Sequence, residues 1–484
     1  MNDSSQRLVI ASNRLPFVFK KVDGSWKVEP GSGGLVTALA PVLRDRGGLW
    51  VGWPGTFEIT DISDSLNAAS EKAGYKMEAV QMTEEEVQKY YQGFSNEVIW
   101  PLFHDLQAYC NFDPDYWKFY KLINERFASV LKKTTKQNDF IWIHDYHLMC
   151  VAKYLRAENF ENNLAFYLHI PFPPLDIFSK LPWRKEILLA ILDYDLIGFQ
   201  SERDSRNFIQ CLETFIKGAK TRKNGKFINV FAGDKNLKIG SFPISIDYNE
   251  FSKMARSKTV ADHAWFIHED IPNSKLILGI DRLDYTKGIT YRLQAFCKLL
   301  LTHPELHRKV TLIQVVVPSR RNIPMYQELK LNIEHLISEI NGQYTRSGWV
   351  PIHYIHRSLP RSELLAYYRT AEIALITPLK DGMNLIAKEY CASNIEKSGS
   401  VILSEFAGAA SQMKDDVLLV NPYNIDEVAD AIYSAINMSL KKRKKQMGRL
   451  QKSIQKYDIY WWLDSFLSAA SAGNLDKYPK LRKG

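Results

Sequence analysis

The chain has 484 residues, of which 45% are hydrophobic, so it is long enough for two or three domains with large buried cores. No apolar run approaches the roughly 18 residues that cross a bilayer, and residues 1–7 carry no signal-peptide pattern. The formal net charge of +9 fits a nucleic acid, an anionic membrane or small phosphorylated substrates as partners.

The cysteines and the basic residues narrow the choice of compartment and of partner. The five cysteines are scattered and none has C-x-x-C spacing, which argues against a disulfide framework or a structural zinc site and predicts a cytoplasmic protein. The densest basic run, residues 441–445, lies in a polar helical segment. We interpret it as a solvated helix face, because no nucleic-acid motif accompanies it. We therefore expect neither a nucleic-acid nor a membrane partner, whereas a homo-oligomer stays open.

The first part of the chain places a cation and a glycine loop after predicted strands. A short buried strand at residues 8–10 leads into a loop that puts Arg14 at the strand's carboxyl end. A glycine loop at residues 30–35 precedes a helix predicted over residues 36–43. The loop lacks the G-x-G-x-x-G pattern of dinucleotide sites, but a glycine loop that opens onto a helix N-terminus still suits a phosphate.

Aromatic residues are dense after a helix predicted over residues 84–91. The stretch at residues 91–101 reads YQGFSNEVIWP. Its aromatic side chains belong either to the core, which is the usual case, or to a platform that stacks on a sugar. Both interpretations remain open from the sequence.

Three histidines follow two further predicted strands, at residues 140–143 and 165–168. His144 and His147 come after the first strand and His169 after the second. A lone histidine is usually a core residue, but three at strand carboxyl ends favour a functional site. No fixed ligand spacing supports a metal.

Helical stretches at residues 150–158 and 183–192 separate these strands, and the alternation predicts a parallel, doubly wound sheet. The pattern restarts after residues 242–247. We expect an α/β fold with a first Rossmann-like domain over residues 1–245 and a second over residues 246–455. A closing helix in residues 456–484 is expected to pack back on the first domain, and a deep cleft to separate the two.

The second half begins with a strand at residues 276–280. Arg282 and Lys287 follow it, on a turn that leads to a helix, and two cations so placed suit a diphosphate. The alternative is a surface ion pair with Asp281 or Asp284. Another strand, residues 310–317, ends just before Arg320, and a third follows at residues 401–403.

Residues 377–390 (TPLKDGMNLIAKEY) combine a strand end, a glycine loop and a helix start. The apolar run before them, residues 373–376, predicts a buried strand, Gly382 allows close approach of a ligand, and Asn384 is expected to cap the helix. A helix N-terminus at a strand's carboxyl end suits a phosphate, whereas the carboxylates of Asp381 and Glu389 suit hydroxyls of a sugar or ribose. The alternative is an ordinary strand-turn-helix.

An ordered series of motifs resembles the trehalose-6-phosphate synthase family over nearly the whole chain. The motifs are Ser12-Asn13-Arg14, Gly33-Gly34-Leu35, Gly52-Trp53, Tyr91 to Trp100, Ile143-His144-Asp145-Tyr146-His147-Leu148, His169-Ile170-Pro171-Phe172-Pro173, Asp281-Arg282-Leu283-Asp284-Tyr285, Lys287-Gly288, Pro318-Ser319-Arg320, Asp381-Gly382-Met383-Asn384-Leu385, Ala387-Lys388-Glu389-Tyr390 and Ser404-Glu405-Phe406-Ala407-Gly408. The resemblance implies a retaining glycosyltransferase of the GT-B fold that uses UDP-glucose as donor and glucose 6-phosphate as acceptor.

The resemblance also implies the residues of the site. Four are expected at the reacting centre: Asp381 and His169 on the transferred glucose, Arg282 and Lys287 on the diphosphate. The donor set adds the uracil neighbour and the phosphate and ribose cradle, namely Leu359, Gly34, Gly382, Met383, Asn384, Leu385, Ile386, Ala387, Lys388 and Glu389. The acceptor set is Arg14, Trp53, Tyr91, Trp100, Asp145 and Arg320, with Arg14, Tyr91 and Arg320 on the phosphate.

Two departures from the family bear on the acceptor. Family members often have Phe-His-Tyr where this chain has Phe103-His104-Asp105, and the loop at residues 221–234 is individual. Similar enzymes, the glucosylglycerol-phosphate synthases, lack the Ser-Asn-Arg and Pro-Ser-Arg signatures that this chain keeps. Another phosphorylated acceptor and a non-catalytic regulatory subunit remain the alternatives.

We expect no metal or other cofactor, because no Asp-x-Asp pair lies in a predicted cleft loop. The sequence does not give the nucleotide preference, the oligomeric state, the regulation or the physiological role.

Overall fold

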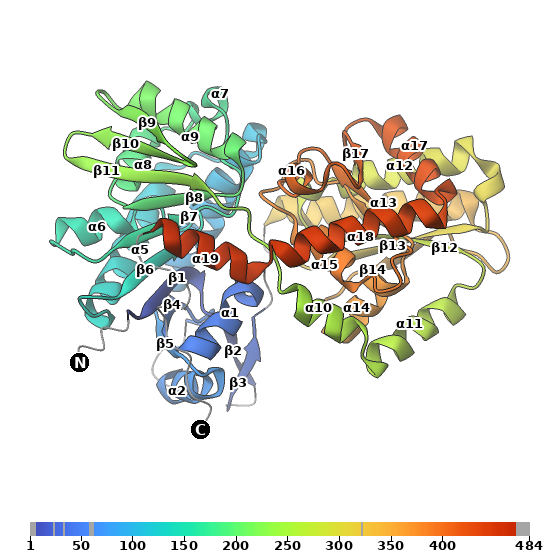
Figure 1. Cartoon of the computed structure of the whole chain (residues 1–484), viewed down its shortest axis with the longest axis horizontal. Coiled ribbons are helices and arrows are strands. Elements are labelled where there is room, and N and C mark those ends of the chain that lie inside the picture. The colour runs from blue at the N-terminus through green and yellow to red at the C-terminus, as the bar shows by residue number, and fades with distance from the viewer. Residues whose placement is uncertain (1–5, 23–24, 32–33, 58–61, 321–322, 471–484) are drawn as a thin grey trace. The chain divides into compact units, whose positions relative to one another are not determined.

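The computed structural model describes residues 6–22, 25–31, 34–57, 62–320 and 323–470 (Figure 1). The chain divides into two compact units. The first comprises Met1–Ile244 and Tyr460–Gly484, and the second comprises Ser245–Ile459. Each unit is built on its own β-sheet, which helices cover.

The sheet of the first unit has the strand order β5-β4-β1-β6-β7-β8-β11-β10-β9. The strands from β5 to β11 run parallel, as predicted, and β10 and β9 are antiparallel additions at one edge. The strands are β1 (Leu8–Arg14), β4 (Leu49–Trp53), β5 (Lys76–Ala79), β6 (Phe140–His144), β7 (Leu164–Tyr167), β8 (Leu196–Phe199), β9 (Lys220–Asn224), β10 (Phe227–Ala232) and β11 (Lys235–Ser241), with a separate hairpin of β2 (Phe17–Val22) and β3 (Ser25–Pro30).

Two expectations for this unit are wrong in detail. Residues 221–234 are not a loop but most of β9 and β10, whose backbone groups pair with each other and with β11. The helix expected over residues 84–91 does not stop there. It begins as α3 (Glu84–Glu86) and continues as a π-helix, η1 (Val87–Ile99).

Helices connect and cover the strands of the first unit (Figure 1). They are α1 (Gly34–Arg46), α2 (Ile62–Ala73), α4 (Trp100–Phe103), η2 (Gln107–Tyr109), α5 (Pro114–Thr134), α6 (Val151–Ala157), α7 (Leu175–Phe178), α8 (Arg184–Ile191), α9 (Glu202–Phe215) and α19 (Ile459–Ala469). The last helix lies against the sheet because the Phe466 ring stacks on Trp142 of β6 with ring centres 4.2 Å apart. The indole nitrogen of Trp462 donates to the Phe242 carbonyl over 3.0 Å.

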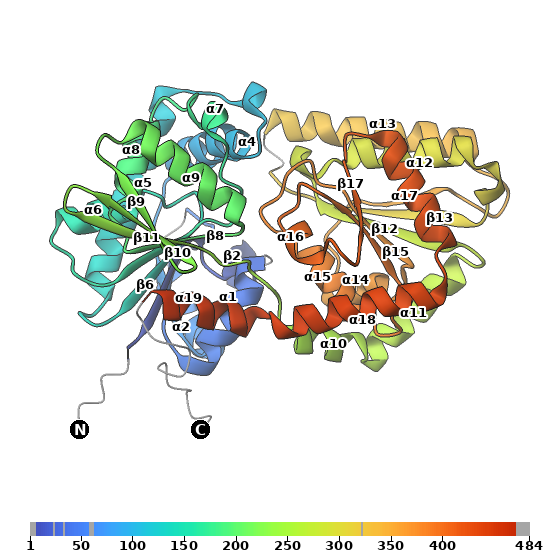
Figure 2. The same cartoon turned by 45° about the horizontal axis from the view of Figure 1, so that its top comes forward.

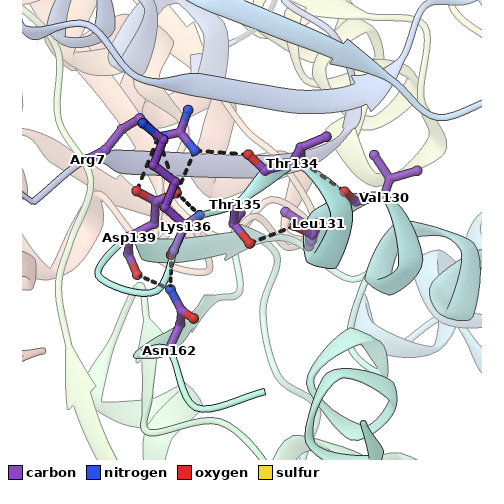
Figure 3. Close-up of polar contacts among 8 residues, drawn as sticks. All are labelled: Arg7, Val130, Leu131, Thr134, Thr135, Lys136, Asp139 and Asn162. Atoms are coloured by element: carbon purple, nitrogen blue, oxygen red, sulfur yellow. Dashed lines mark hydrogen bonds and ion pairs between the residues drawn. The ribbon is translucent and has the colours of Figure 1, made fainter. Parts of the chain in front are cut away.

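A polar network closes the amino end of the first sheet (Figure 3). The Asp139 carboxylate, 4% exposed, accepts hydrogen bonds from the Arg7 guanidinium at 2.6 Å and from the backbone nitrogen of Lys136 at 2.7 Å. Arg7 also donates to the Thr134 carbonyl at the end of α5, and Asn162 donates to the Asp139 carbonyl. The buried Asp139 carboxylate is therefore satisfied, and the network joins the ends of β1, α5 and β6.

The second sheet is parallel throughout, in the order β14-β13-β12-β15-β16-β17. Its strands are β12 (Lys275–Arg282), β13 (Val310–Val317), β14 (Ile352–Ile355), β15 (Ile373–Ile376), β16 (Ser400–Ser404) and β17 (Leu418–Val420). The predicted strands at residues 276–280, 310–317, 373–376 and 401–403 are confirmed. Every residue of β15 and β16 is buried, which is typical of parallel strands covered on both faces.

Two layers of helices cover this sheet (Figure 1, Figure 2). One face carries α12 (Ile289–Thr302), α13 (Pro324–Tyr344) and α17 (Ile425–Asn437), and their apolar side chains form one core with the strands. The other face carries α10 (Tyr248–Ala255), α11 (Lys258–Asp270), α14 (Arg361–Thr370), α15 (Leu385–Ser393) and α18 (Leu440–Lys456). The basic run of residues 441–445 lies on α18, where four lysines are exposed and Arg443 is buried. No helix in the described part of the chain is long and apolar enough to cross a membrane.

Candidate active site

Arg14 lies over two aromatic rings at the carboxyl edge of the first sheet. It is the last residue of β1, and Trp53 is the last residue of the neighbouring strand β4. The guanidinium carbon of Arg14 is 4.5 Å from the Trp53 ring centre and 5.6 Å from that of Tyr91. Both rings attract the cation through their faces, so the exposed Arg14 side chain is oriented without an acidic partner being required.

Tyr91 is positioned by the π-helix η1. Its carbonyl accepts a hydrogen bond of 2.6 Å from the Asn96 side chain, and its ring stacks on His147 with centres 5.7 Å apart and planes 15° apart. Helices of this kind are rare and frequently occur at functional sites. The sequence predicts a helix over residues 84–91 but does not distinguish π from α geometry.

Ring contacts continue from His147 to Trp100. The His147 ring lies 3.9 Å from Tyr146, and Tyr146 lies 5.7 Å from Trp100, which is buried against His104. The aromatic residues of the 91–101 stretch therefore include both core residues and residues of the candidate site. Trp100 is buried, while Tyr91 is half-buried beside Arg14.

Asp145 and His169 are adjacent at the ends of β6 and β7. Asp145 has the left-handed backbone conformation, φ 74°, and its Oδ1 accepts a 3.2 Å hydrogen bond from the His169 backbone nitrogen. The structure therefore places five of the predicted acceptor residues, all but Arg320, at one edge of the first sheet. His169 from the donor set lies at the same edge.

The two histidines His144 and His169 form a neutral pair. The Nδ1 atom of His144 lies 3.1 Å from the Nε2 atom of His169. Burial lowers the pKa of His169 to about 3. Burial, and then the proximity of His169, hold the pKa of His144 well below its ordinary value. Near neutral pH, His169 can therefore offer a hydrogen bond to a sugar but not a positive charge.

Lys287 and Asp381 form an ion pair in the second unit. Lys287 ends the short helix η3 (Tyr285–Lys287) after β12, and its Nζ donates to Asp381 Oδ2 over 2.6 Å. The side chains keep 9% and 16% of their surface exposed. Arg282, the last residue of β12, is exposed.

Asp281 and Asp284, the neighbours of Arg282 in sequence, each form an ion pair with an arginine from another element. Asp281 pairs with Arg292 of α12, and Asp284 pairs with Arg320 at the end of β13. Neither of these two ion pairs uses Arg282 or Lys287. Sequence proximity could not reveal Arg292 and Arg320 as partners, because both residues come from other elements.

The glycine loop at residues 381–383 is held against the loop after β16. A Cβ atom added to Gly408 would lie 1.8 Å from the Gly382 carbonyl oxygen, so only glycine fits there. Backbone hydrogen bonds run from Gly408 to Asp381 at 3.1 Å and from Ala409 to Met383 at 2.8 Å. The loop is thus rigidly placed before α15.

The expectation that Asn384 caps α15 with its side chain is wrong. Asn384 occupies the N-cap position, but it has a left-handed backbone, φ 70°, and makes no side-chain cap bond. Its amide instead donates to Asp381 Oδ2 over 3.2 Å. Asp381 is therefore oriented by both Lys287 and Asn384.

The remaining donor-set residues lie on α15 and in two loops. Leu385, Ile386 and Ala387 are the first residues of α15. Lys388 is 2% exposed beside α16 (Ala410–Met413) and α18, and burial lowers its pKa to about 7. Glu389 accepts a 3.0 Å hydrogen bond from Tyr368, and burial raises its pKa.

Leu359 lies half-buried between β14 and α14, and Gly34 opens α1. Gly33, part of the glycine loop named from the sequence, lies outside the described residues. The sequence reasoning missed Tyr326 and Tyr368, which hold Arg320 and Glu389. Both come from helices with no motif that would signal this role.

No group of three or more His, Cys, Asp or Glu side chains in the described ranges could hold a metal ion. The aromatic and cationic edge of the first unit suits a phosphorylated sugar. The Lys287 turn and the start of α15 in the second unit suit a diphosphate and sugar hydroxyls.

Comparison with known proteins agrees with this reading. The model of glycosyltransferase family 20 matches residues 6–472. A trehalose-6-phosphate synthase of Mycolicibacterium gilvum is 38% identical over 472 residues, covering 96% of this chain and 93% of that protein.

Two solved structures are similar over nearly the whole chain. A UDP-forming α,α-trehalose-phosphate synthase from Burkholderia xenovorans, in complex with glucose-6-phosphate, has a TM-score of 0.87 and 30% identity and covers 96% of this chain and 100% of that one. A structure described as trehalose-6-phosphate from E. coli, bound with UDP-2-fluoro glucose, has a TM-score of 0.87 and 34% identity and covers 96% and 99%.

Proposed function

The chain belongs to glycosyltransferase family 20, and from this membership we infer that it transfers glucose from UDP-glucose to glucose 6-phosphate. The products are α,α-trehalose 6-phosphate and UDP, and the configuration of the donor carbon is retained. The observation that carries this function is the full-length similarity to structures whose ligands are glucose-6-phosphate and UDP-2-fluoro glucose. The GT-B type α/β fold predicted from the sequence is confirmed by the same similarity.

We propose that the second unit binds the nucleotide sugar. Arg282 and Lys287 hold the diphosphate, because leaving UDP develops negative charge that two cations stabilise. The N-terminus of α15 adds its free N–H groups and its dipole to the binding of the diphosphate. Gly34 of the first unit is assigned to the same phosphate and ribose cradle. Glu389, oriented by Tyr368, accepts from the ribose hydroxyls, and the backbone near Leu359 meets the uracil.

We propose that the first unit binds the acceptor. Arg14 and Tyr91 take the phosphate of glucose 6-phosphate, joined by Arg320 of the second unit. Asp145 accepts from the sugar hydroxyls, and Trp53 and Trp100 form apolar walls. The cation over two rings supports this assignment, because Arg14 is oriented while its guanidinium stays exposed to a dianion.

The transferred glucose is assigned to Asp381 and His169. Asp381 accepts from hydroxyls, and His169 acts as a neutral hydrogen-bonding group. We propose that the acceptor hydroxyl attacks on the face from which UDP departs and passes its proton to the departing phosphate. No pair of carboxylates is assigned to a double displacement. A cytoplasmic location remains a prediction from the sequence, and whether the protein forms a homo-oligomer stays open.

We also propose that transfer needs no metal, because Arg282, Lys287 and the start of α15 supply the positive potential that a divalent ion would otherwise provide. Transfer should therefore persist in a chelator. Loss of activity in EDTA and its return with magnesium would contradict this.

An acceptor panel tests the proposed function. UDP release from UDP-glucose is measured with glucose 6-phosphate, free glucose and glycerol 3-phosphate at equal concentration, and the product is identified by NMR. We expect the highest rate with glucose 6-phosphate and two α anomeric signals. Preference for glycerol 3-phosphate would identify the enzyme as a glucosylglycerol-phosphate synthase, and no release with any acceptor would favour a regulatory subunit.

A further inference from the structure

One buried carboxylate bridges the ends of two neighbouring strands in the second unit. Asp284 lies two residues after β12 and is 1% exposed. Its Oδ1 accepts hydrogen bonds from the Thr286 backbone nitrogen at 3.0 Å and from the Thr286 hydroxyl at 2.9 Å. Its Oδ2 accepts a 3.1 Å hydrogen bond from Arg320 Nη1, which follows β13.

Asp284 remains ionised although it is buried. Burial by itself raises the pKa of Asp284, but the charges of Arg320, Lys287 and Arg282 outweigh burial, and the pKa lies below its ordinary value. A buried carboxylate is kept only where such partners compensate the loss of water. The negative charge is therefore shared among three cations of the proposed substrate site.

Arg320 is held on a second side by Tyr326 of α13. The same Nη1 atom donates to the Tyr326 hydroxyl, and the guanidinium carbon lies 5.4 Å from the Tyr326 ring centre. Tyr326 in turn packs on Tyr285 with ring centres 5.3 Å apart. The Arg320 side chain is 7% exposed, so its planar fork is fixed in one orientation before any substrate binds.

We propose that Asp284 is a positioning residue that sets acceptor specificity through Arg320. This inference rests on the proposed function, in which Arg320 binds the phosphate of the acceptor. The two carboxylate oxygens have separate tasks: Oδ2 orients Arg320, whereas Oδ1 fixes the turn that carries Lys287. Loss of the Oδ2 contact alone should lower discrimination between glucose 6-phosphate and free glucose and leave donor binding intact.

The variant Asp284→Asn separates the two tasks. Its amide oxygen can still accept from Thr286, whereas its NH₂ group would face Arg320 donor to donor and cannot hold it. We expect kcat/KM for glucose 6-phosphate to fall about tenfold or more, which is the scale of a lost charge-assisted hydrogen bond. KM for UDP-glucose and turnover of free glucose should change less than about threefold. Asp284→Ala, which loses both contacts, should also raise KM for UDP-glucose.

Combination with Arg320→Ala tests whether Asp284 acts through Arg320. In that background, Asp284→Asn should change glucose 6-phosphate turnover by less than about twofold, because the group that it orients is absent. A full multiplicative effect would overturn the inference. A lower KM for glucose 6-phosphate in Asp284→Asn would also overturn it, because Asp284 would then compete with the phosphate for Arg320.

Asp281→Asn is the matched control. It removes a carboxylate of similar burial three residues earlier, whose partner is Arg292 rather than Arg320. It should not change the ratio of the two acceptors. If Asp284→Asn does not fold, Tyr326→Phe decides, because it removes the other contact to Nη1. A selective loss with glucose 6-phosphate supports the proposal, and an equal effect on both acceptors overturns it.

The proposed function can fail separately. If the wild-type protein used free glucose as well as glucose 6-phosphate, the phosphate role of Arg320 would be lost before any Asp284 variant was compared.

Discussion

Two ion pairs of the second unit have the same length but different surroundings. Arg292 Nη1 lies 2.6 Å from Asp281 Oδ2, with the two side chains 0% and 1% exposed. Lys287 Nζ also lies 2.6 Å from Asp381 Oδ2, with 9% and 16% exposed. Distance therefore does not distinguish a structural pair from one that can exchange partners, whereas burial and neighbouring groups do.

The Arg292–Asp281 pair, called the sealed pair below, is too deeply buried for a ligand to reach it. Arg292 also donates to Thr377 at 3.1 Å and to Gln314 at 3.3 Å, and a Cβ atom on Gly279 would meet both Gln314 and Arg292. Lys287 is also largely buried, but it lies on the turn after β12 and contacts the glycine loop through Asp381, which keeps 16% of its side-chain surface exposed. We infer that the Arg292 pair stabilises the fold and that Lys287 exchanges Asp381 for the donor diphosphate.

The largest expected effect is on the stability of Arg292→Ala. It leaves the buried Asp281 carboxylate without its partner, which should cost about 3–5 kcal/mol of unfolding free energy in denaturant titration. Adding Asp281→Asn should restore part of that loss, because the uncompensated charge is removed. A cost below about 1 kcal/mol would show that the sealed pair is dispensable.

Lys287→Ala should show the opposite balance. We expect kcat/KM with UDP-glucose to fall by an amount equivalent to about 2–4 kcal/mol of transition-state stabilisation, with kcat affected as well as KM. Unfolding free energy should fall by less than in Arg292→Ala, because Asp381 keeps 16% of its side-chain surface exposed and retains the hydrogen bond from Asn384. Lys330→Ala, which removes a half-exposed pair with Glu334, is the control and should change neither quantity.

Gly408→Ala tests the loop that holds Asp381 opposite Lys287. The added methyl group would overlap the Gly382 carbonyl, so the loop must move, at a cost of about 1–3 kcal/mol in stability and with loss of transfer. Gly448→Ala is the matched control, since nothing lies within 4 Å of its Cβ position in α18. That change should stabilise the helix by about 0.5–1 kcal/mol, and equal effects of the two variants would contradict the close packing.

A similar contrast separates His144, which is fully buried, from His169, which is partly exposed at the candidate site. His144 is fully buried and its pKa is lowered, so the unfolded chain binds a proton that the folded protein does not. Stability should therefore fall as the pH drops below the ordinary histidine value of about 6.5, by up to about 1.4 kcal/mol per pH unit. His144→Phe should reduce that slope between about pH 6.5 and 5, as measured by denaturant titration at several pH values. An unchanged slope would mean that His144 is protonated in the folded protein.

Much of the fold could be predicted from the sequence because buried parallel strands are continuous apolar runs. Residues 310–317 and 373–376 match β13 and β15 residue for residue. Loop chemistry was less predictable. Asn384 has the residue type of a helix cap, yet its left-handed backbone turns the amide toward Asp381.

The partners within the site were the hardest to predict. Asp281 and Asp284 lie within two residues of Arg282 in sequence, and the structure adds ion pairs to Arg292 and Arg320. These contacts depend on which strands are neighbours and on how α12 packs, and both are properties of the folded sheet. Residue types at strand ends thus indicated the site, while the pairing within it needed the structure.

The most direct test of the exchange at Lys287 is calorimetric titration of UDP into the wild-type protein, Lys287→Ala and Asp381→Asn. If Lys287 exchanges Asp381 for the diphosphate, Lys287→Ala should bind UDP at least about tenfold more weakly. Asp381→Asn should bind UDP at least as tightly as the wild type, because the competing carboxylate is gone, although transfer is lost. Equal UDP affinity in Lys287→Ala, or weaker affinity in Asp381→Asn, would contradict the exchange and make this pair as structural as that of Arg292 and Asp281.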